Sequence, residues 1–466
     1  MSLYDLTMAE AAARLKSGDI SAVELTESCL ARIGETEGAL NAYVTVTGEE
    51  ALEAAAAAGK ELAAGRVRGP MHGIPVCVKD LCDMTGLATT ASSKVRHDHM
   101  ADSDAAVVAR LKDAGAVIVG KTHTHEFAYG ISTPTTRNPW NTDCIPGGSS
   151  GGTAASVAAR GCFAGIGTDT GGSIRIPAAL CGLVGLKPTY GRVSRAGVTS
   201  LSWSLDHVGP LARTVEDAAN MLGVLAGYDA RDPGSVDLPV PDYTAGMNDG
   251  IAGLRLGRPT NFYFDGMDDE ARGLVEAALA ALQAAGAEIV PVELPLAKTY
   301  MAVEFGLCLP EASAYHEKEL RTRADLYGED VRTFLEAGEL IPATDYIRAL
   351  RVREQIKQGW AALMAPGGVD AIVAPTVPAA AARVDRDMFT WPDGEEETTT
   401  NAYVRHSCPA NVTGLPSITV PCGFTAAGLP VGFQTIGRPY AEADIVRIAR
   451  SYEATVDWSA RAPDPR

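Results

Sequence analysis

The sequence has few basic residues for its length. Its 466 residues include 40 Lys and Arg against 58 Asp and Glu, so the formal net charge is −18 at pH 7. Proteins that bind nucleic acids or anionic membrane surfaces neutralise phosphates with clustered Lys and Arg. We therefore expect neither a nucleic acid nor a membrane among the partners of this protein.

Long hydrophobic runs and a secretion signal are also missing. No apolar run reaches the roughly 18 residues that a membrane-spanning helix needs. The first seven residues, Met1–Thr7, contain neither the basic nor the apolar stretch of a signal peptide. These absences lead us to expect a cytoplasmic protein.

Cysteine is sparse and scattered. The chain has nine cysteines, an odd number, and no two of them form a Cys-x-x-Cys pair. A disulfide framework or a structural zinc site requires paired, closely spaced cysteines, so we expect reduced and mostly buried thiols. The nine are Cys29, Cys77, Cys82, Cys144, Cys162, Cys181, Cys308, Cys408 and Cys422.

The residues that are present indicate a globular α/β protein. Hydrophobic residues make up 46% of the chain and charged residues 21%, which is typical of globular proteins. We expect the first 65 residues to be helical, because Thr7 with Glu10 and Ser21 with Glu24 have the spacing of capping boxes. Further along, short apolar runs alternate with helical stretches. This alternation favours a mostly parallel or mixed sheet with helical crossovers.

Individual elements follow from the same patterns. The predicted strands cover residues 74–78, 116–119, 162–166, 254–257, 287–292, 369–374, 417–420 and 429–434. The predicted helices after residue 70 cover 104–114 and 268–285. Residues 228–250 are predicted to be a connecting loop, and residues 383–400 a mobile excursion.

Glycine and serine are concentrated between Pro146 and Pro188. This segment contains GGSSGG (147–152), GTDTGGSIR (167–175) and CGLVGLKPT (181–189). Glycine at this density costs conformational entropy, and it is kept where the backbone takes special dihedral angles or approaches a ligand closely. We interpret the segment as a backbone-lined site for an anion or oxyanion, with serines inside it.

Two familiar motifs match this region only formally. Gly115 to Thr122 has the spacing of a phosphate-binding loop, but the four residues between its glycines are predicted to form a buried strand. Gly147 to Gly151 matches Gly-x-Ser-x-Gly, but a nucleophile elbow needs a strand directly before it, and a loop precedes this one. We reject both interpretations.

A third chemistry uses serine with lysine as the base. A lysine serves as a base if burial lowers its pKa. Lys79 closes the predicted strand in GIPVCVKD (73–80), and a lysine at the end of a buried strand is costly unless it has partners or a role. By itself, such a lysine would be expected to extend to solvent.

Together these segments resemble the amidase signature family. The matching motifs are GIPVCVKD, PGGSSGG and GTDTGGSIRIPAALCGLVGLKPTYGRV, and Ala374–Thr376, Leu415–Pro421 and Gly428–Gln434 also fit. The resemblance covers about residues 5–455. It implies a single α/β/α domain around a large twisted mixed sheet and no cofactor. It also implies hydrolysis of an amide by a Ser-Ser-Lys triad through an acyl-enzyme, with release of ammonia or an amine.

The resemblance assigns roles to particular residues. Ser173 matches the nucleophile, Ser149 the bridging serine that follows a cis peptide bond from Gly148, and Lys79 the base. Backbone N–H groups in a glycine-rich turn converge on an anion, and the family places the oxyanion hole at Thr170, Gly171, Gly172 and Ser173. The supporting residues that it implies are Ser150, Asp169 and Arg175.

The resemblance also bears on domains and on substrate contacts. We expect one domain over residues 1–466, made of a helical part (1–65), the catalytic signature core (70–220) and the remainder of the sheet with pocket walls (250–455). The pocket walls are predicted in variable loops at 125–135 and 300–350. Candidate substrate contacts are His125, Phe127 and Tyr129, although ordinary core packing explains the two aromatic residues equally well.

Other interpretations of the site remain open. His123 and His125 have the spacing of a metal-binding pair but lack a clear third ligand, so we expect no metal. The same family includes the glutaminase component of the tRNA-dependent amidotransferase, and residues 191–210 look similar to that protein. However, residues 311–321, EASAYHEKELR, lack its Tyr-Asp-Gly-x-Arg-Tyr-Gly stretch. A non-catalytic descendant is disfavoured because Lys79, Ser149 and Ser173 are all present.

The sequence leaves the substrate and the assembly undetermined. We expect a small-molecule amide as substrate, but neither the acyl group nor the leaving amine follows from the sequence. The oligomeric state is open as well, with a homodimer as one candidate.

Overall fold

Eleven strands form one mixed sheet that runs through the protein. The computed structural model describes residues 2–456, 458 and 461–465. The sheet order is β1-β3-β2-β4-β6-β5-β12-β13-β9-β7-β8. Its strands are β1 (Tyr43–Val46), β2 (Pro75–Lys79), β3 (Val117–Thr122), β4 (Ala164–Asp169), β5 (Val184–Lys187), β6 (His207–Ala212), β7 (Arg255–Pro259), β8 (Glu288–Val292), β9 (Ala371–Pro375), β12 (Ser417–Phe424) and β13 (Pro430–Ile436).

Thirteen α-helices are found in the described residues. They are α1 (Met8–Ser17), α2 (Ala22–Leu40), α3 (Gly48–Ala63), α4 (Ala106–Asp113), α5 (Gly151–Ala158), α6 (Arg175–Cys181), α7 (Val215–Leu225), α8 (Asp269–Ala284), α9 (Tyr300–Arg323), α10 (Glu329–Glu339), α11 (Ala343–Leu363), α12 (Thr399–Thr413) and α13 (Glu442–Glu453). Within residues 2–456, 458 and 461–465, no helix combines the length and the apolar character that crossing a bilayer requires.

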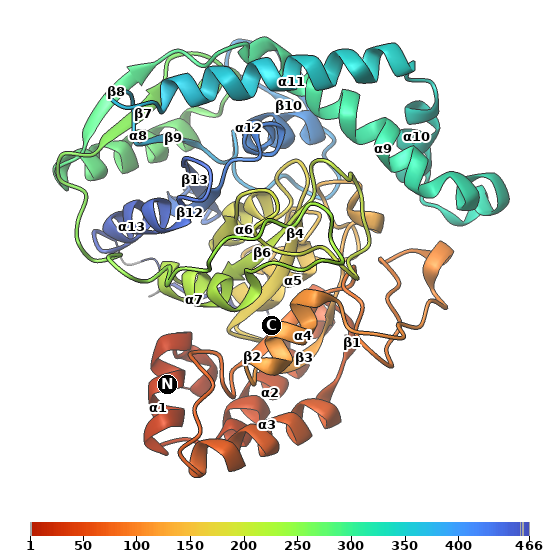
Figure 1. Cartoon of the computed structure of the whole chain (residues 1–466), viewed down its shortest axis with the longest axis vertical. Helices are drawn as coiled ribbons and strands as arrows, with labels where there is room; N and C mark the ends of the chain where they lie inside the picture. Colours follow the sequence, from red (N-terminus) through yellow and green to blue (C-terminus); the bar gives the residue numbers. More distant parts are fainter. Residues whose placement is uncertain (1, 457, 459–460, 466) are drawn as a thin grey trace.

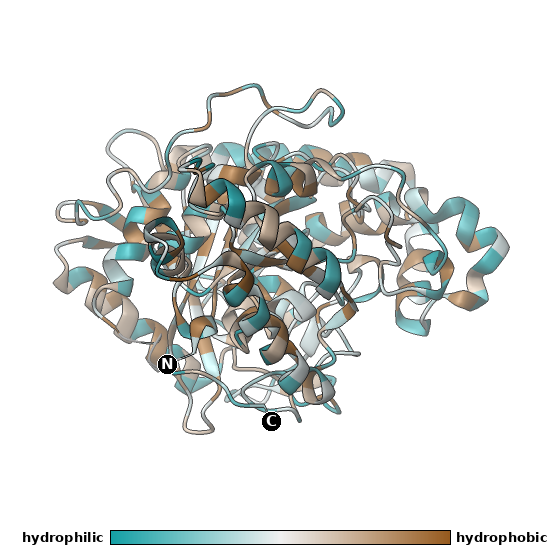
Figure 2. Ribbon diagram, turned by 90° about the horizontal axis from the view of Figure 1, so that it is seen from below, coloured by the Kyte–Doolittle hydropathy of each residue, from teal (hydrophilic) through white to brown (hydrophobic). Residues whose placement is uncertain are grey.

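The helices lie in layers on the sheet. α4, α7, α8 and α13 pack along one side, and α5, α6, α9, α11 and α12 pack together on the other. In Figure 1 the N-terminal helices α1 to α3 lie at the lower end of the molecule and α9 to α11 at the upper end. Hydrophilic segments gather on the outer helices and loops, and hydrophobic segments lie toward the middle (Figure 2). The fold is thus the predicted α/β architecture around a large mixed sheet.

The N-terminal segment is mostly, but not wholly, helical. Both predicted capping boxes are present, with the Glu10 N–H donating to Thr7 Oγ1 and the Glu24 N–H to Ser21 Oγ, each at 3.1 Å. The expectation of helix throughout residues 1–65 is wrong at Tyr43–Val46, which forms β1 antiparallel to β3. β-branched and aromatic residues in this short run favour an extended strand at the edge of the sheet.

Residues 383–400 also depart from the prediction. They contain a two-stranded antiparallel hairpin, β10 (Met388–Thr390) with β11 (Glu396–Thr398), and the start of α12. The Phe389 ring stacks on Trp391 at 5.1 Å and meets Tyr403 edge to face, which anchors the hairpin on α12.

The loop predicted at 228–250 contains no helix or strand.

Two parallel strands position the site. β2 pairs with β4 in register Val76 to Ala164 and Val78 to Ile166. Because both strands run in the same direction, their carboxyl ends meet at one edge of the sheet. Lys79 is the last residue of β2 and Asp169 the last of β4, so the predicted base and the glycine-rich segment are brought together by strand pairing.

Candidate active site

Lys79 is a fully buried lysine surrounded by hydroxyl groups. Its Nζ lies 2.7 Å from Ser149 Oγ, 2.9 Å from Ser150 Oγ and 2.8 Å from Thr168 Oγ1. No carboxylate of the described residues forms an ion pair with it. Burial lowers the pKa of Lys79 to about 7, although Cys82, Asp169 and Asp206 partly oppose this shift. The amine is therefore partly neutral near pH 7, as a general base must be.

The neighbouring buried lysine has a different environment. Lys121, on the adjacent strand β3, forms an ion pair with Asp80 at 2.7 Å, and both side chains are fully buried. It also donates to Thr89 Oγ1 at 2.7 Å. Lys121, the lysine of the apparent phosphate-binding motif, thus lies within a strand and is paired with Asp80. This placement agrees with the rejection of that motif.

The segment before α5 presents two serines to Lys79. The Gly148–Ser149 peptide bond is cis, as expected. The Ser149 carbonyl accepts hydrogen bonds from the His125 N–H at 3.0 Å and from Thr133 Oγ1 at 3.1 Å. The segment 125–133 therefore holds this turn in place. In the described residues no strand lies directly before Gly147, so the context of a nucleophile elbow is absent here as well.

Ser150 and Thr168 close the ring of hydroxyl groups around the lysine. Ser150 Oγ donates to the Thr168 carbonyl and accepts from the Thr168 N–H, each at 3.2 Å. The Ser150 N–H also donates to the Ser173 carbonyl at 3.3 Å. This last bond links the segment before α5 to the segment before α6, which carries the predicted nucleophile.

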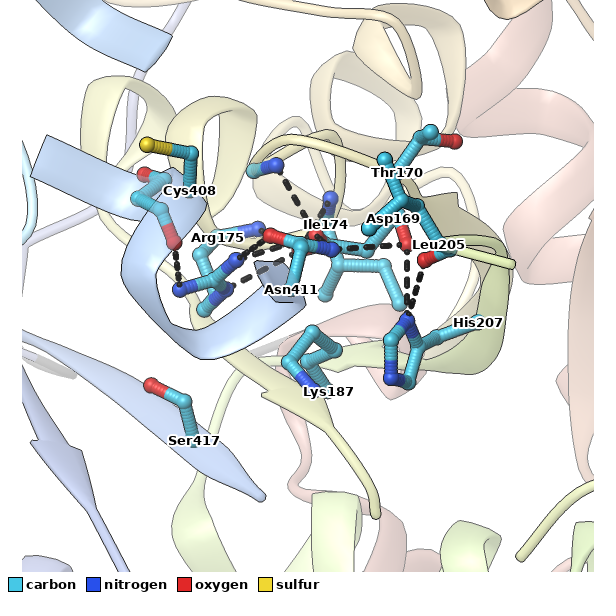
Figure 3. A network of polar contacts seen from close by, with 12 residues as sticks. Asp169, Thr170, Ile174, Arg175, Lys187, Leu205, His207, Cys408, Asn411 and Ser417 are labelled. Carbon is cyan, nitrogen blue, oxygen red and sulfur yellow. Dashed lines mark hydrogen bonds and ion pairs between the residues drawn. The ribbon is translucent and has the colours of Figure 1, made fainter. Parts of the chain in front are cut away.

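An ion pair between Asp169 and Arg175 organises the loop between them (Figure 3). Arg175 binds Asp169 with Nε and Nη2, each at 3.0 Å. Arg175 also donates hydrogen bonds to α12 and β13. The acceptors are the Ser407 carbonyl, Asn411 Oδ1 and Gln434 Oε1. Burial alone would raise the pKa of Asp169, but the charge and hydrogen bonds of Arg175 outweigh burial and hold that pKa well below its usual range.

The Asp169 carboxylate shapes the loop 170–173 directly. It accepts the N–H groups of Gly172 at 2.8 Å and of Ile174 at 3.1 Å. Gly172 has a φ of +127°, and an added Cβ would lie 2.4 Å from Ser407 Cβ, so only glycine fits there. Of the four N–H groups expected to form the oxyanion hole, that of Gly172 is engaged with Asp169. Those of Thr170, Gly171 and Ser173 donate to no residue in the described part of the chain.

A small cavity of about 50 Å³ lies beside Ser173. Its walls come from the segment 128–131, from α9 and from α12, with Phe334 of α10. The two predicted wall regions thus contribute, but 300–350 is helical over most of its length rather than a loop. The lining residues are Ala128, Tyr129, Gly130, Ile131, Thr170, Gly171, Ser173, Leu201, Glu304, Phe305, Cys308, Phe334, Thr400 and Val404.

The three candidate substrate contacts are not equivalent. Tyr129 lines the cavity. Phe127 is not among the residues that line the cavity. Its ring packs against His316 and Tyr327, with centroids 4.3 Å and 5.7 Å apart. His125 faces α10, where its Nε2 lies 3.0 Å from Asp330 Oδ2. Of the three, only Tyr129 is therefore placed to meet a substrate.

The two histidines of the His-x-His pair point to separate partners. His123 Nδ1 lies 3.1 Å from Ser92 Oγ, whereas His125 binds Asp330. Among the residues that the structure describes, no group of three or more His, Cys, Asp or Glu side chains is arranged to hold a metal ion. All nine cysteines are free and buried.

Comparison with known proteins shows the family of this chain. Residues 24–446 match the family model described as Amidase. This chain belongs to the amidase family. It is an amide hydrolase. An amidase of Pseudomonas putida is 50% identical to it over 464 residues, and the match covers 99% of this chain and 98% of that one.

Two further relatives show the range of this family. A glutamyl-tRNA(Gln) amidotransferase component of Geobacter metallireducens is 41% identical over 490 residues, covering 98% of this amidase and 99% of that protein. The structure of the peptide amidase of Stenotrophomonas maltophilia superposes with a TM-score of 0.86 at 34% identity, covering 98% of each chain.

Sequence reasoning missed two residues of the amidase site. Thr168 contacts Lys79 directly, and its position just before Asp169 in GTDTGGSIR was a usable signal. Glu304 lies in α9 on the cavity wall, 131 residues after Ser173 (304 − 173). Nothing in its local sequence distinguishes it from the other charged residues of α9.

Proposed function

We propose that this amidase cleaves its substrate through an acyl-enzyme on Ser173, with Lys79 as base and Ser149 as proton relay. The observation that carries the proposal is the environment of Lys79. A buried lysine that contacts three hydroxyl groups and no carboxylate is suited to proton transfer rather than to ion pairing. A neutral amine has two N–H donors and one lone pair, so it accepts from Ser149 while it donates to Ser150 and Thr168.

In the first half-reaction, Ser173 Oγ attacks the carbonyl carbon of the amide. Its proton passes to Ser149 Oγ, and the Ser149 proton passes to Lys79 Nζ. The developing oxyanion accepts hydrogen bonds from the N–H groups of Thr170, Gly171 and Ser173. When the C–N bond breaks, the proton returns through Ser149 to the leaving nitrogen, and ammonia or an amine departs.

In the second half-reaction, water cleaves the ester on Ser173. Lys79 and Ser149 accept a proton from the water, which attacks the acyl carbon, and then return it to Ser173 Oγ as the carboxylic acid leaves. The proton is carried in this cycle by Lys79, Ser149 and Ser173, and all three residues belong to one chain.

We further propose that the enzyme acts alone rather than as part of an amidotransferase. A glutamine substrate brings an α-carboxylate, which requires a placed cation. The cavity beside Ser173 is lined by one ionisable acid, Glu304, and by no Lys or Arg among the described residues. The absence of the Tyr-Asp-Gly-x-Arg-Tyr-Gly stretch after Ser313 supports the same conclusion.

The cellular setting and the assembly are part of the proposal. Nine free, buried thiols support a cytoplasmic location, where cysteines stay reduced. The net charge of −18 supports the absence of nucleic acid and of anionic membranes among its partners. A homodimer is compatible with the mechanism but is not required by it.

The test is a turnover assay with chemical labelling. The purified protein should hydrolyse simple amides other than glutamine, and Ser173→Ala should lower kcat by at least 10⁴-fold with unchanged circular dichroism. A fluorophosphonate should label Ser173, as located by mass spectrometry. Full activity in Ser173→Ala would disprove the nucleophile. Glutaminase activity that appears only with an amidotransferase partner and charged tRNA would disprove independent action.

A further inference from the structure

Glu304 is a buried acid in the cavity beside the nucleophile. Its exposed fraction is 2%, and it lines the cavity together with Ser173 and Gly171. Neither of its carboxyl oxygens forms a hydrogen bond or an ion pair with any residue that the structure describes, and Oε2 is fully buried without a partner. Buried polar groups are normally hydrogen-bonded, so an unpaired carboxyl group beside the nucleophile is a candidate contact for a substrate.

A second glutamate on the same helix provides a comparison. Glu311, two turns further along α9, accepts hydrogen bonds from Ser202 Oγ at 2.6 Å, the Ser204 N–H at 2.9 Å and the Tyr346 hydroxyl at 3.0 Å. Glu311 therefore has a structural role that occupies its oxygens. Glu304 has no such partners although it is more deeply placed, so packing does not account for it.

The surroundings of Glu304 favour an uncharged carboxylic acid. An ionised carboxylate without a paired cation is costly to bury. Burial raises the pKa of Glu304 well above its usual value, and the attraction of Arg353 does not offset this effect. The neutral acid has an O–H donor beside a C=O acceptor. The rest of the cavity near it is largely apolar, with Phe305, Cys308 and Val404.

Its position relative to the reacting loop limits the substrate further. A Cβ added to Gly171 would lie 2.8 Å from Glu304 Oε1, so the carboxyl group packs directly against the loop that ends at Ser173. A substrate group bound by Glu304 is therefore separated from the scissile carbonyl by a short spacer.

We propose that Glu304 is a substrate-contact residue that selects amides carrying a second, uncharged hydrogen-bonding group, such as a second carboxamide. This inference rests on the proposed function, since it assigns a substrate class to the same Ser173 site. Oε1, the carboxyl oxygen beside Gly171, would hydrogen-bond the second carboxamide, either donating to its oxygen or accepting from its N–H. A purely aliphatic side group would make no such bond, and a cationic group would require the ionised form of the acid.

Matched substrates test the proposal. Malonamide, succinamide and glutaramide should be compared with 3-methylbutanamide, 4-methylpentanamide and 5-methylhexanamide, in which a branched alkyl group replaces one carboxamide. We expect kcat/KM for the best diamide to exceed that of its alkyl counterpart at least tenfold. Glu304→Gln keeps a donor and an acceptor and should retain the preference within about threefold, whereas Glu304→Leu should reduce the ratio to two or less.

Several features keep this test decisive. The ratio for two substrates in one variant does not depend on the fraction of folded enzyme, and Glu311→Gln, which changes stability only, should leave the ratio unchanged. In the Ser173→Ala background, calorimetry should show diamide binding that Glu304→Leu weakens at least tenfold. An unchanged ratio in Glu304→Leu, no diamide preference in the wild type, or a preference for 4-aminobutanamide would overturn the inference. Hydrolysis of all amides that survives Ser173→Ala would instead overturn the proposed function.

Discussion

Lys79 Nζ and Ser149 Oγ lie 2.7 Å apart in the protein interior, in contact with no carboxylate of the described chain. One strand away, Lys121 and Asp80 form a buried ion pair at the same distance. The two lysines have the same side chain and the same burial, yet their partners differ. Lys79 has hydroxyl partners and no carboxylate to hold its ammonium form, and burial lowers its pKa to about 7.

Lys79 should control the pH dependence of catalysis. Because its pKa is about 7 and only the neutral amine accepts a proton, kcat/KM should rise as the pH increases through about 7 and then level off. Lys79→Ala should lower kcat at least 10³-fold and remove this limb. In contrast, Lys121→Met should lower stability by about 3–5 kcal/mol, because it leaves Asp80 buried and unpaired, but should preserve the limb. A pH limb near 7 that persists in Lys79→Ala would contradict the assignment.

Ser149→Ala should lower kcat strongly, but less than Lys79→Ala does, because a water molecule can partly replace the relay hydroxyl. We expect a loss in kcat of about 10²–10³-fold, with KM changed far less. Steady-state kinetics on the same amide provides the measurement. Thr299→Ala, at the start of α9 and outside the cavity, is a suitable control. If Ser149→Ala retained more than a tenth of wild-type kcat, the relay would be wrong.

Asp169 should stabilise the protein only above its own titration range. Its pKa in the folded state is lowered, so the stabilisation is fully present above the usual carboxyl value near 4 and is lost as the pH falls further. Asp169→Asn should lower the free energy of unfolding by about 3–5 kcal/mol at pH 7, since it leaves Arg175 buried without its partner. Urea unfolding at pH 7 measures the effect of the variant, and a series of unfolding curves at decreasing pH below 4 measures the loss in the wild type.

A surface pair supplies the control for that experiment. Asp385 forms an ion pair with Arg383, and both side chains are more than half exposed. Solvent screens such pairs, so Asp385→Asn should leave the unfolding curve unchanged at both pH values. If the two variants behaved alike, the ion pair between Asp169 and Arg175 would have no special structural role.

Chelators should leave the activity unchanged. His123 and His125 have separate hydrogen-bond partners, and the mechanism uses no metal ion. Turnover after dialysis against EDTA should equal that of the untreated enzyme, while a zinc-dependent hydrolase in the same buffer is inactivated. Loss of activity in EDTA that added zinc restores would instead establish a metal site at these histidines.

We propose that the chain unfolds as one domain. β5 pairs with β12, so hydrogen bonds join the strands before residue 220 to those after residue 250 in a single sheet. Thermal unfolding should therefore give one calorimetric transition whose midpoint agrees with circular dichroism. Trp140 and Trp360 report on different parts of the chain, and their fluorescence should change at the same temperature. Two resolved transitions would show that the parts are separate domains.

Local sequence patterns predicted much of the architecture. The strands at 75–79, 164–169, 371–375 and 430–436 were each predicted within about three residues, because fully buried strands appear as short apolar runs. The pattern failed at Val184–Lys187 and His207–Ala212, where glycine, proline and lysine interrupt the run. These strands are held by neighbours on both sides in the sheet, and pairing of this kind is not visible in a local window.

The amide hydrolase activity could be predicted from sequence motifs alone. Lys79, Ser149 and Ser173 lie in long, specific motifs, because the turns that carry them require glycine and serine at fixed positions. The groups that surround these residues, in contrast, depend on how the chain folds. Arg175 reaches Asn411 and Gln434 more than 230 residues away, and the face of α9 that places Glu304 in the cavity is set by packing. Hydrogen bonds and desolvation act over a few ångströms in space, so burial and partners are fixed only when distant segments pack together.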